Sequence, residues 1–188
     1  GNNPIAFSMP CPNGDPVILD MALSVVARAK IRDAQKRGEK IPDTWATDRD
    51  GLPTQDPAAA LDGILLPIGG YKGYGLSTMV DLFAGMLSGA AFLTHVKSWV
   101  DSPEEPQNLG HFFILIDTKR FAPAEELARR MKDFADILHA TPPVDAARPV
   151  LMAGEPEMRA MARAREQGIS LPQSLIAFLE QKAALAKG

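Results

Sequence analysis

Alternating and continuous runs of apolar residues divide the chain into predicted strands and helices. Residues 4–10 and 17–19 carry strand-forming apolar side chains, and the turn Pro12-Asn13-Gly14-Asp15 lies between them. An Asn-Gly step supplies the positive φ angles that a tight hairpin turn requires. The pattern therefore predicts a β-hairpin near the start of the chain.

A helix and a long irregular segment are predicted next. Asp20 has the side chain of a helix N-cap, and Gly38 marks the end of a helix that runs to about Arg37. Residues 39–66 are rich in Pro, Gly, Asp and Thr and show little periodicity, which predicts an irregular loop. Loops of this length in a compact domain are commonly functional.

The longest apolar segment, residues 75–93, predicts a buried helix rather than a membrane span, because it carries Asp81 and several Ser, Thr and Gly residues. Gly85 and Gly89 would allow another backbone to approach this helix closely. Its apolar side chains at helical spacing are Leu76, Met79, Val80, Phe83 and Leu87. We expect such a helix in a packed centre or in a subunit contact.

Strand and helix patterns also alternate in the second half of the chain. Residues 111–117 form a continuous apolar run that is typical of a fully buried strand. Pro123 begins an amphipathic helix, and two more helices are predicted from Pro156 to Gln167 and from Ser170 to about Ala184. This mixture of strand and helix patterns predicts an α/β fold with a mixed sheet and flanking helices. No sharp linker divides the chain.

Composition is that of a folded domain and narrows the choice of partners. The chain has 188 residues, of which 46% are hydrophobic and 23% charged, and its formal net charge is −3. The sequence has no basic cluster, so nucleic acid is not an expected partner. No membrane association is expected either. The single cysteine, Cys11, cannot form an internal disulfide, which suits a cytoplasmic location.

Residues 69–76, Gly-Gly-Tyr-Lys-Gly-Tyr-Gly-Leu, are the strongest functional signal. Glycines permit positive φ and close backbone approach, the N-terminus of a following helix favours anions, and Lys72 adds a full positive charge. This combination predicts a site for a phosphate or carboxylate ligand. From the residues alone, a glycine-rich turn with a surface lysine is an equally good interpretation. The spacing matches neither the Rossmann motif nor the P-loop.

Short segments along the chain also occur together in one order. They are GNNPIAF at 1–7, LDMA at 19–22, KIPDTWATD at 40–48, GLPTQDP at 51–57, YKGYGL at 71–76, GHFFI at 110–114 and GEPE at 154–157. In these segments the chain resembles the NAD(P)-dependent L-malate/L-lactate dehydrogenase type of oxidoreductase. That family also contains ureidoglycolate dehydrogenase, sulfolactate dehydrogenase and piperideine-2-carboxylate reductase.

The resemblance implies a non-Rossmann NAD(P)-binding fold, a homodimer, and hydride transfer between NAD or NADP and a small 2-hydroxy or 2-oxo acid. The cofactor contacts that it implies come from Asp20, Met21, Ala22, Lys72, Gly154, Glu155 and Pro156. Members of the family carry a further N-terminal region with the acid–base histidine, to which nothing in this sequence corresponds. We therefore expect residues 1–188 to be the cofactor-binding, C-terminal part of a longer enzyme, without a catalytic acid–base residue.

Three histidines were candidates for proton transfer, because this side chain changes charge near neutral pH. His95 follows a predicted helix and His139 ends another, where a cation suits the helix dipole, so a structural role is sufficient for both. His111 matches a polar position of the family and is predicted to lie on the substrate side. No spacing of ligand residues predicts a metal site. The alternative to an enzyme is a catalytically silent module that binds an anion or forms a dimer.

Overall fold

The computed structural model of the chain describes residues 3–12, 14–99 and 102–185. They form two compact units, of which the first comprises Gly1–Met9 and Ile18–Glu126. The second comprises Pro10–Val17 and Leu127–Gly188. The sequence did not predict this division. The units are defined by which residues contact one another in space, and no linker of distinctive composition marks the boundary.

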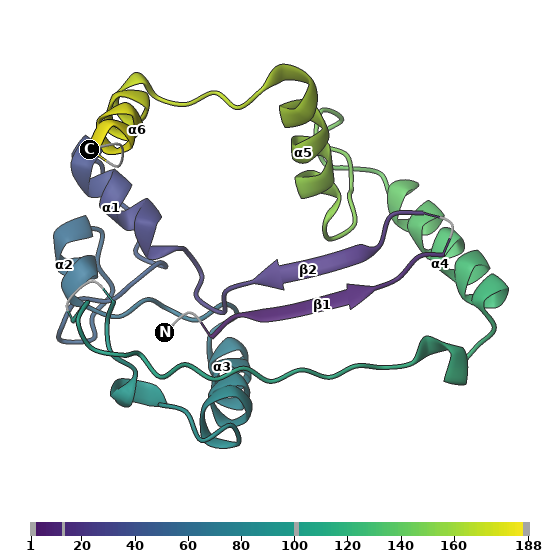
Figure 1. Ribbon diagram of the computed structural model, residues 1–188, viewed down its shortest axis with the longest axis horizontal. Helices are drawn as coiled ribbons and strands as arrows, with labels where there is room; N and C mark the ends of the chain where they lie inside the picture. Colours follow the sequence, from purple (N-terminus) through teal and green to yellow (C-terminus); the bar gives the residue numbers. More distant parts are fainter. Residues whose placement is uncertain (1–2, 13, 100–101, 186–188) are drawn as a thin grey trace. The chain divides into compact units, whose positions relative to one another are not determined.

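The first unit begins with the two predicted strands. Strand β1 spans Ile5–Met9 and strand β2 spans Val17–Met21, and they pair antiparallel (Figure 1). The predicted turn includes Asn13, which lies outside the described residues. Beside it, the Gly14 N–H donates a hydrogen bond of 3.2 Å to the Cys11 carbonyl. In the described part of the chain, the sheet consists of this pair.

The helix after β2 begins later than the sequence predicted. Helix α1 spans Arg28–Arg37, and Asp20 lies within β2, so the prediction that Asp20 caps this helix is wrong. Strand pairing persists to Met21, which keeps the backbone at Asp20 extended. The predicted end is confirmed, because Gly38 has φ of 67° and its N–H bonds to the carbonyls of the last turn.

The core of the first unit lies where α1 packs on helix α2, Pro57–Asp62. Asp56 caps α2 by accepting a hydrogen bond of 3.0 Å from the Ala58 N–H. The buried core side chains are Val26, Ile31, Ala34, Ile41, Ala46 and Ala60. Several of these come from residues 39–66, so the predicted irregular loop contributes to the core and contains a short helix.

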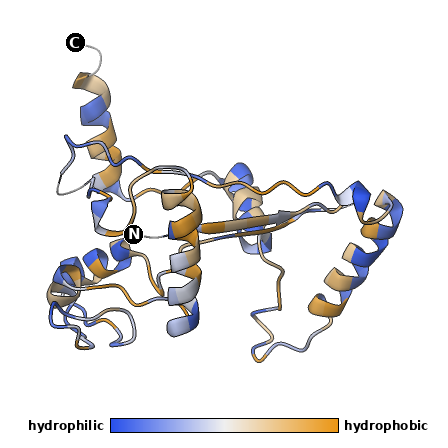
Figure 2. Ribbon diagram, turned by 90° about the horizontal axis from the view of Figure 1, so that it is seen from below, coloured by the Kyte–Doolittle hydropathy of each residue, from blue (hydrophilic) through white to orange (hydrophobic). Residues whose placement is uncertain are grey.

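Helix α3 spans Tyr71–Asp81 and continues into a π-helical turn, η1, at Leu82–Met86. The predicted helix is present. Within the described residues it does not lie in a packed centre, and the alternative, a subunit contact, stays a prediction. Its apolar face is open, and Met86 and Leu87 are 55% and 69% exposed. Figure 2 shows orange, apolar stretches as well as blue, polar ones along the helix ribbons. Gly85 does allow a close approach, since a Cβ there would lie 3.1 Å from the Ala91 carbonyl oxygen.

Residues 111–117 are extended but form no strand in the described chain, so the prediction of a buried strand is wrong (Figure 1). Leu115 is 92% exposed, and its apolar neighbours are also exposed. The apolar run has strand character but lacks a neighbouring strand to pair with. The short 3-10 helices η2, Leu93–His95, and η3, Thr118–Arg120, lie on either side of it in the chain.

The remaining helices were predicted well. Helix α4 spans Ala124–His139, directly after Pro123, and helix α5 spans Glu155–Gln167 and ends at Gly168. Helix α6 spans Gln173–Leu185, so it begins after Pro172 and not at Ser170. Among the described residues, no helix is long and apolar enough to cross a membrane.

Candidate functional site

Backbone hydrogen bonds join the end of β2 to the segment that leads into α3. The Ile68 N–H donates to the Leu23 carbonyl at 3.0 Å, and the Val25 N–H donates to the Leu66 carbonyl at 2.8 Å. Predicted cofactor residues Asp20, Met21 and Ala22 directly precede one of these segments, and the glycine-rich turn directly follows the other. The structure therefore connects the first two groups of predicted cofactor residues within the first unit.

The glycine-rich turn leaves the N-terminus of α3 open. Gly69 and Gly70 have φ of 57° and 61°, the left-handed region that favours glycine. A Cβ at either position would meet nothing within 4 Å, so the space beside the turn is free. Gly70 is the N-cap and provides no side-chain hydrogen bond. The first N–H groups of α3 consequently lack a capping side chain, which is the arrangement that accommodates an anion.

Lys72 is the second residue of α3. Its side chain is exposed and forms no hydrogen bond or ion pair with the residues that the structure describes. A lysine at this position places a mobile cation beside the helix N–H groups. The turn and Lys72 together are suited to a phosphate or another anion.

Gly73 and Gly75 within α3 have different surroundings, although both belong to the same glycine-rich segment of the sequence. A Cβ at Gly73 would lie 1.8 Å from the Ile68 carbonyl oxygen, so this glycine permits close packing within the chain itself. A Cβ at Gly75 would meet nothing within 4 Å. Gly75 lines a shallow apolar hollow along the exposed face of α3 and η1, with a volume of about 500 Å³. Gly73 is explained without any ligand.

His111 lies away from the glycine-rich turn. The preceding residue, Gly110, packs so closely against η1 that a Cβ there would lie 1.9 Å from the Ala84 carbonyl oxygen. Ala84 follows Lys72 by twelve residues, which corresponds to roughly 18 Å along a helix. His111 is exposed, and its ring centroid lies 6.3 Å from that of Phe113. The structure therefore does not bring the predicted substrate residue to the predicted cofactor residues of this unit.

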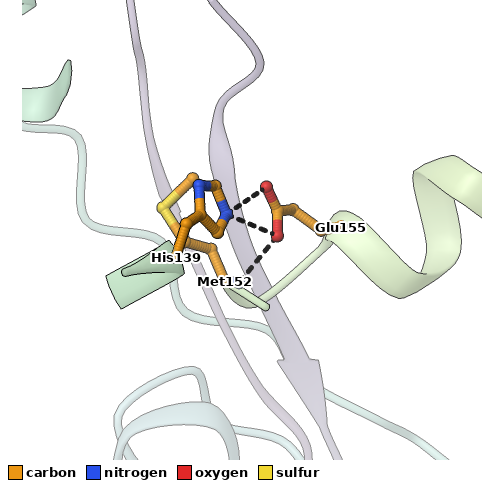
Figure 3. A network of polar contacts seen from close by, with 3 residues as sticks. All are labelled: His139, Met152 and Glu155. Carbon is orange, nitrogen blue, oxygen red and sulfur yellow. Dashed lines mark hydrogen bonds and ion pairs between the residues drawn. The ribbon is translucent and has the colours of Figure 1, made fainter. Parts of the chain in front are cut away.

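The second unit contains the other predicted cofactor residues at the start of α5. Gly154 is the N-cap, with φ of 95°, and Glu155 and Pro156 open the helix. Both Glu155 carboxylate oxygens lie within hydrogen-bond distance of His139 Nε2, at 2.9 and 3.0 Å. The Met152 N–H donates to Glu155 Oε2 at 2.9 Å. Figure 3 shows these three residues converging on the carboxylate.

The charge state of Glu155 follows from these contacts. Partial burial acts to raise the pKa of its carboxyl, but the hydrogen bonds from His139 and Met152 and the charges of His139 and Arg159 outweigh that effect. The pKa of Glu155 therefore lies below its ordinary value of 4.5. Glu155 is a carboxylate at neutral pH, so this helix N-terminus already holds an anion and can accept hydrogen bonds from hydroxyl groups.

Sequence reasoning missed three side chains near these sites. Asn3 Nδ2 donates to the Ser77 carbonyl at 2.8 Å and so joins the start of the chain to α3. The Ser24 hydroxyl is buried beside the β2 end of the site without a hydrogen-bond partner among the described residues. His139 was interpreted as structural, and its pairing with Glu155 was not expected. Spacing along the chain could not have revealed the contacts of Asn3 and His139, because these contacts join positions far apart in the sequence.

The fold and these sites define an α/β protein with one turn suited to phosphate and one turn suited to hydroxyl donors, the two kinds of group that a dinucleotide presents. Among the described residues, no group of three or more His, Cys, Asp or Glu side chains could hold a metal ion. Comparison with known proteins agrees with this class. The model of the malate/L-lactate dehydrogenase family matches residues 1–180, and the chain belongs to this family.

Individual relatives are similar over most of the chain. The chain is 43% identical to Delta(1)-pyrroline-2-carboxylate reductase of Ancylobacter novellus, over 96% of the chain and 52% of that protein. It is 35% identical to ureidoglycolate dehydrogenase (NAD(+)) of Escherichia coli K12, over 95% of the chain and 51% of that protein. With (2R)-3-sulfolactate dehydrogenase (NADP(+)) of Chromohalobacter salexigens it shares 41% identity, over 65% of the chain and 37% of that protein.

A solved structure gives the same result for the fold. The crystal structure of a dehydrogenase from Sinorhizobium meliloti matches with a TM-score of 0.82 and 36% identity, over 96% of this chain and 52% of that one. The predicted α/β class and family are thereby confirmed. The chain spans about half the length of the curated relatives that it matches.

Proposed function

We propose that this chain supplies the cofactor site of an NAD(P)-dependent oxidoreductase that acts on a small 2-hydroxy or 2-oxo acid, or on a related cyclic imine. The observation that carries the proposal is the open, uncapped N-terminus of α3 with Lys72 in its first turn. Because the chain spans half the length of its relatives, activity would belong to a longer protein in which residues 1–188 are the cofactor-binding part.

In each unit, taken by itself, the candidate residues suit a kind of group that NAD or NADP carries. Lys72 and the free N–H groups of α3 would neutralise and orient the diphosphate. Asp20, Met21 and Ala22 would line the cofactor beside them. The Glu155 carboxylate, framed by Gly154 and Pro156, would accept hydrogen bonds from ribose hydroxyls. The cofactor, when bound, would donate a hydride to C2 of a 2-oxo acid in its reduced form, or accept one from C2 of a 2-hydroxy acid in its oxidised form.

Proton transfer requires a group that these sites do not include. His111 lies near the opposite end of the helix from Lys72, and His139 is engaged with Glu155. In this proposal the acid–base residue comes from the remainder of the longer protein. The contribution of this chain is positioning and charge neutralisation, which can account for large rate enhancements without a proton-transfer group.

A homodimer is part of the proposal, because the apolar face of α3 and η1 is exposed and monomers seldom leave so large a continuous apolar face uncovered. The same face supports the alternative that the chain is a catalytically silent dimerisation or anion-binding module. We also propose a cytoplasmic location, because Cys11 is a free thiol.

An activity panel tests the proposal. Purified full-length protein is incubated with NADH or NADPH and a series of 2-oxo acids and cyclic imines, and oxidation of the reduced cofactor is followed by absorbance. We expect turnover with at least one substrate and a preference for one cofactor. Absence of turnover together with measurable cofactor binding would support the silent module, and absence of binding would refute the cofactor site.

A further inference from the structure

A polar contact fixes the turn at the start of α5 from outside that helix. His139 is the last residue of α4, and Glu155 is the first residue of α5, sixteen positions later. His139 Nε2 lies 2.9 and 3.0 Å from the two carboxylate oxygens of Glu155 (Figure 3). The imidazole therefore faces the centre of the carboxylate and restricts its rotation.

The carboxylate in turn holds the backbone of the turn. Glu155 Oε2 accepts the Met152 N–H at 2.9 Å, and the Glu155 N–H donates to the Met152 carbonyl at 3.2 Å. Between these residues Gly154 adopts φ of 95°, a conformation with no side-chain cap to support it. Only 16% of the Glu155 side chain is exposed, whereas His139 is 40% exposed.

Among the described residues, His139 reaches this turn from a different element, the end of α4. Its imidazole contacts the Glu155 carboxylate, which also accepts the Met152 N–H. Arg159, one turn further along α5, adds positive charge near the carboxylate but lies on the same helix. Removal of the imidazole would leave Glu155 free to turn toward solvent. The Met152 N–H would lose its acceptor, and the backbone at Gly154 would lose its restraint.

We propose that His139 is a positioning residue for cofactor binding, which acts through Glu155 on the backbone of the Gly154–Pro156 turn. The inference rests on the proposed function, because it assigns that turn to the cofactor. His139 itself does not contact the cofactor. Its role is to keep the Glu155 carboxylate and the adjacent backbone in one orientation before the cofactor arrives, which lowers the ordering cost of binding.

The test is titration of NADH or NADPH, whichever the wild type binds, into the full-length protein and its variants. His139→Ala removes the imidazole, and we expect the cofactor Kd to rise about five- to tenfold, as for other directly coupled neighbours. His139→Gln keeps a donor near the Nε2 position, and its Kd should stay within about twofold of wild type. With saturating cofactor, kcat of His139→Ala should remain close to wild type, since only binding is affected.

Lys132→Ala is the matched control, because Lys132 pairs with Asp136 on the exposed side of the same helix α4. Its Kd should equal that of wild type. If His139→Ala does not fold, His139→Gln is compared with His139→Asn, whose amide is too short to reach Glu155. The proposal then requires weaker binding for the Asn variant alone.

The outcomes separate the two proposals. If wild type binds cofactor and the His139 variants bind it equally well, the positioning role is refuted and the proposed function stands. If wild type binds neither cofactor, the proposed function fails and the positioning role fails with it.

Discussion

Lys72 and Glu155 show how two helix N-termini of one chain acquire opposite chemistry. At α3 the cap is a glycine, so the N–H groups and the Lys72 cation are available to an anion. At α5 the N-cap is also a glycine, but Glu155 follows it and places a negative charge at the positive end of the helix dipole. One terminus is therefore suited to phosphate, and the other is suited to hydroxyl donors.

The lowered pKa of Glu155 predicts a pH-dependent contribution to stability. A carboxyl whose pKa is lowered on folding stabilises the protein fully above its ordinary value of 4.5, and this contribution is lost as the pH falls through the folded value. Glu155→Gln should reduce the free energy of unfolding by about 1 kcal/mol at pH 7, a modest value because His139 is partly exposed. Urea denaturation across pH 3–7 measures the difference.

The difference between wild type and Glu155→Gln should shrink as the pH falls below 4.5. A difference that grows on acidification would contradict the assigned ion pair. Glu157→Gln is the matched control, because Glu157 lies in the same first turn of α5 and forms no ion pair among the described residues.

Site residues were predictable from sequence where the chemistry is local. From spacing and charge alone, the glycine frame and Lys72 could be proposed as an anion site, with a glycine-rich turn and a surface lysine as an equal alternative. Gly154, Glu155 and Pro156 were identified only through the family resemblance, because their local sequence is that of an ordinary turn before a helix. The contact between His139 and Glu155 was unpredictable, since it depends on how the loop between α4 and α5 returns on itself.

At the scale of the element, helix α3 carries two glycines with opposite requirements. Gly73 packs against the Ile68 carbonyl, whereas Gly75 faces open space on the exposed side of the helix. We expect Gly73→Ala to destabilise the protein by about 1–3 kcal/mol, as overpacking does. Gly75→Ala should instead stabilise it by roughly 0.5–1 kcal/mol through helix propensity. Urea denaturation of both variants provides the comparison.

Equal effects of the two substitutions would show that the Ile68 contact does not constrain α3. Cofactor titration of Gly75→Ala adds a second control. Because Gly75 faces the apolar hollow and not the open turn, cofactor affinity should be unchanged in this variant.

Elements were predicted correctly where short-range signals define them. Gly38 and Gly168 end helices because glycine readily adopts the conformations found after the last helical turn, and Pro123 precedes α4 as expected for a first-turn proline. The prediction that Asp20 caps a helix was wrong. Aspartate suits a helix cap by residue type, but strand pairing determined the backbone conformation at this position. Within the described chain, the burial of residues 111–117 and the placement of α3 in a packed centre failed as predictions, because an apolar pattern specifies a need for partners and not their presence.

At the scale of the whole chain, exposed apolar surface is the dominant property. Residues Phe112 to Ile116 are extended, uncharged and exposed, and in the described chain no strand pairs with them. An unpaired apolar strand is a template for association with another chain. We infer that residues 112–116 contribute to any self-association of the 188-residue chain, in addition to the apolar face of α3 and η1.

Leu115→Lys should therefore reduce self-association of the 188-residue chain, measured by sedimentation velocity at several concentrations. The side chain is 92% exposed, so lysine at this position should not disturb packing. Val144→Lys is the matched control, because Val144 is a fully exposed apolar residue in the loop before α5. Identical sedimentation of Leu115→Lys and wild type would assign self-association to the apolar face of α3 and η1.

The central claim is that α3 and Lys72 bind the phosphate groups of a nicotinamide dinucleotide, and titration of the full-length protein with reduced cofactor tests it most directly. Fluorescence gives the Kd for wild type, for Lys72→Ala, and for the control Lys30→Ala in α1. Loss of one charge-assisted contact should cost about 1.5–3 kcal/mol, which raises the Kd of Lys72→Ala roughly tenfold to 150-fold. Lys30→Ala should bind like wild type, whereas an unchanged Kd for Lys72→Ala would contradict the account.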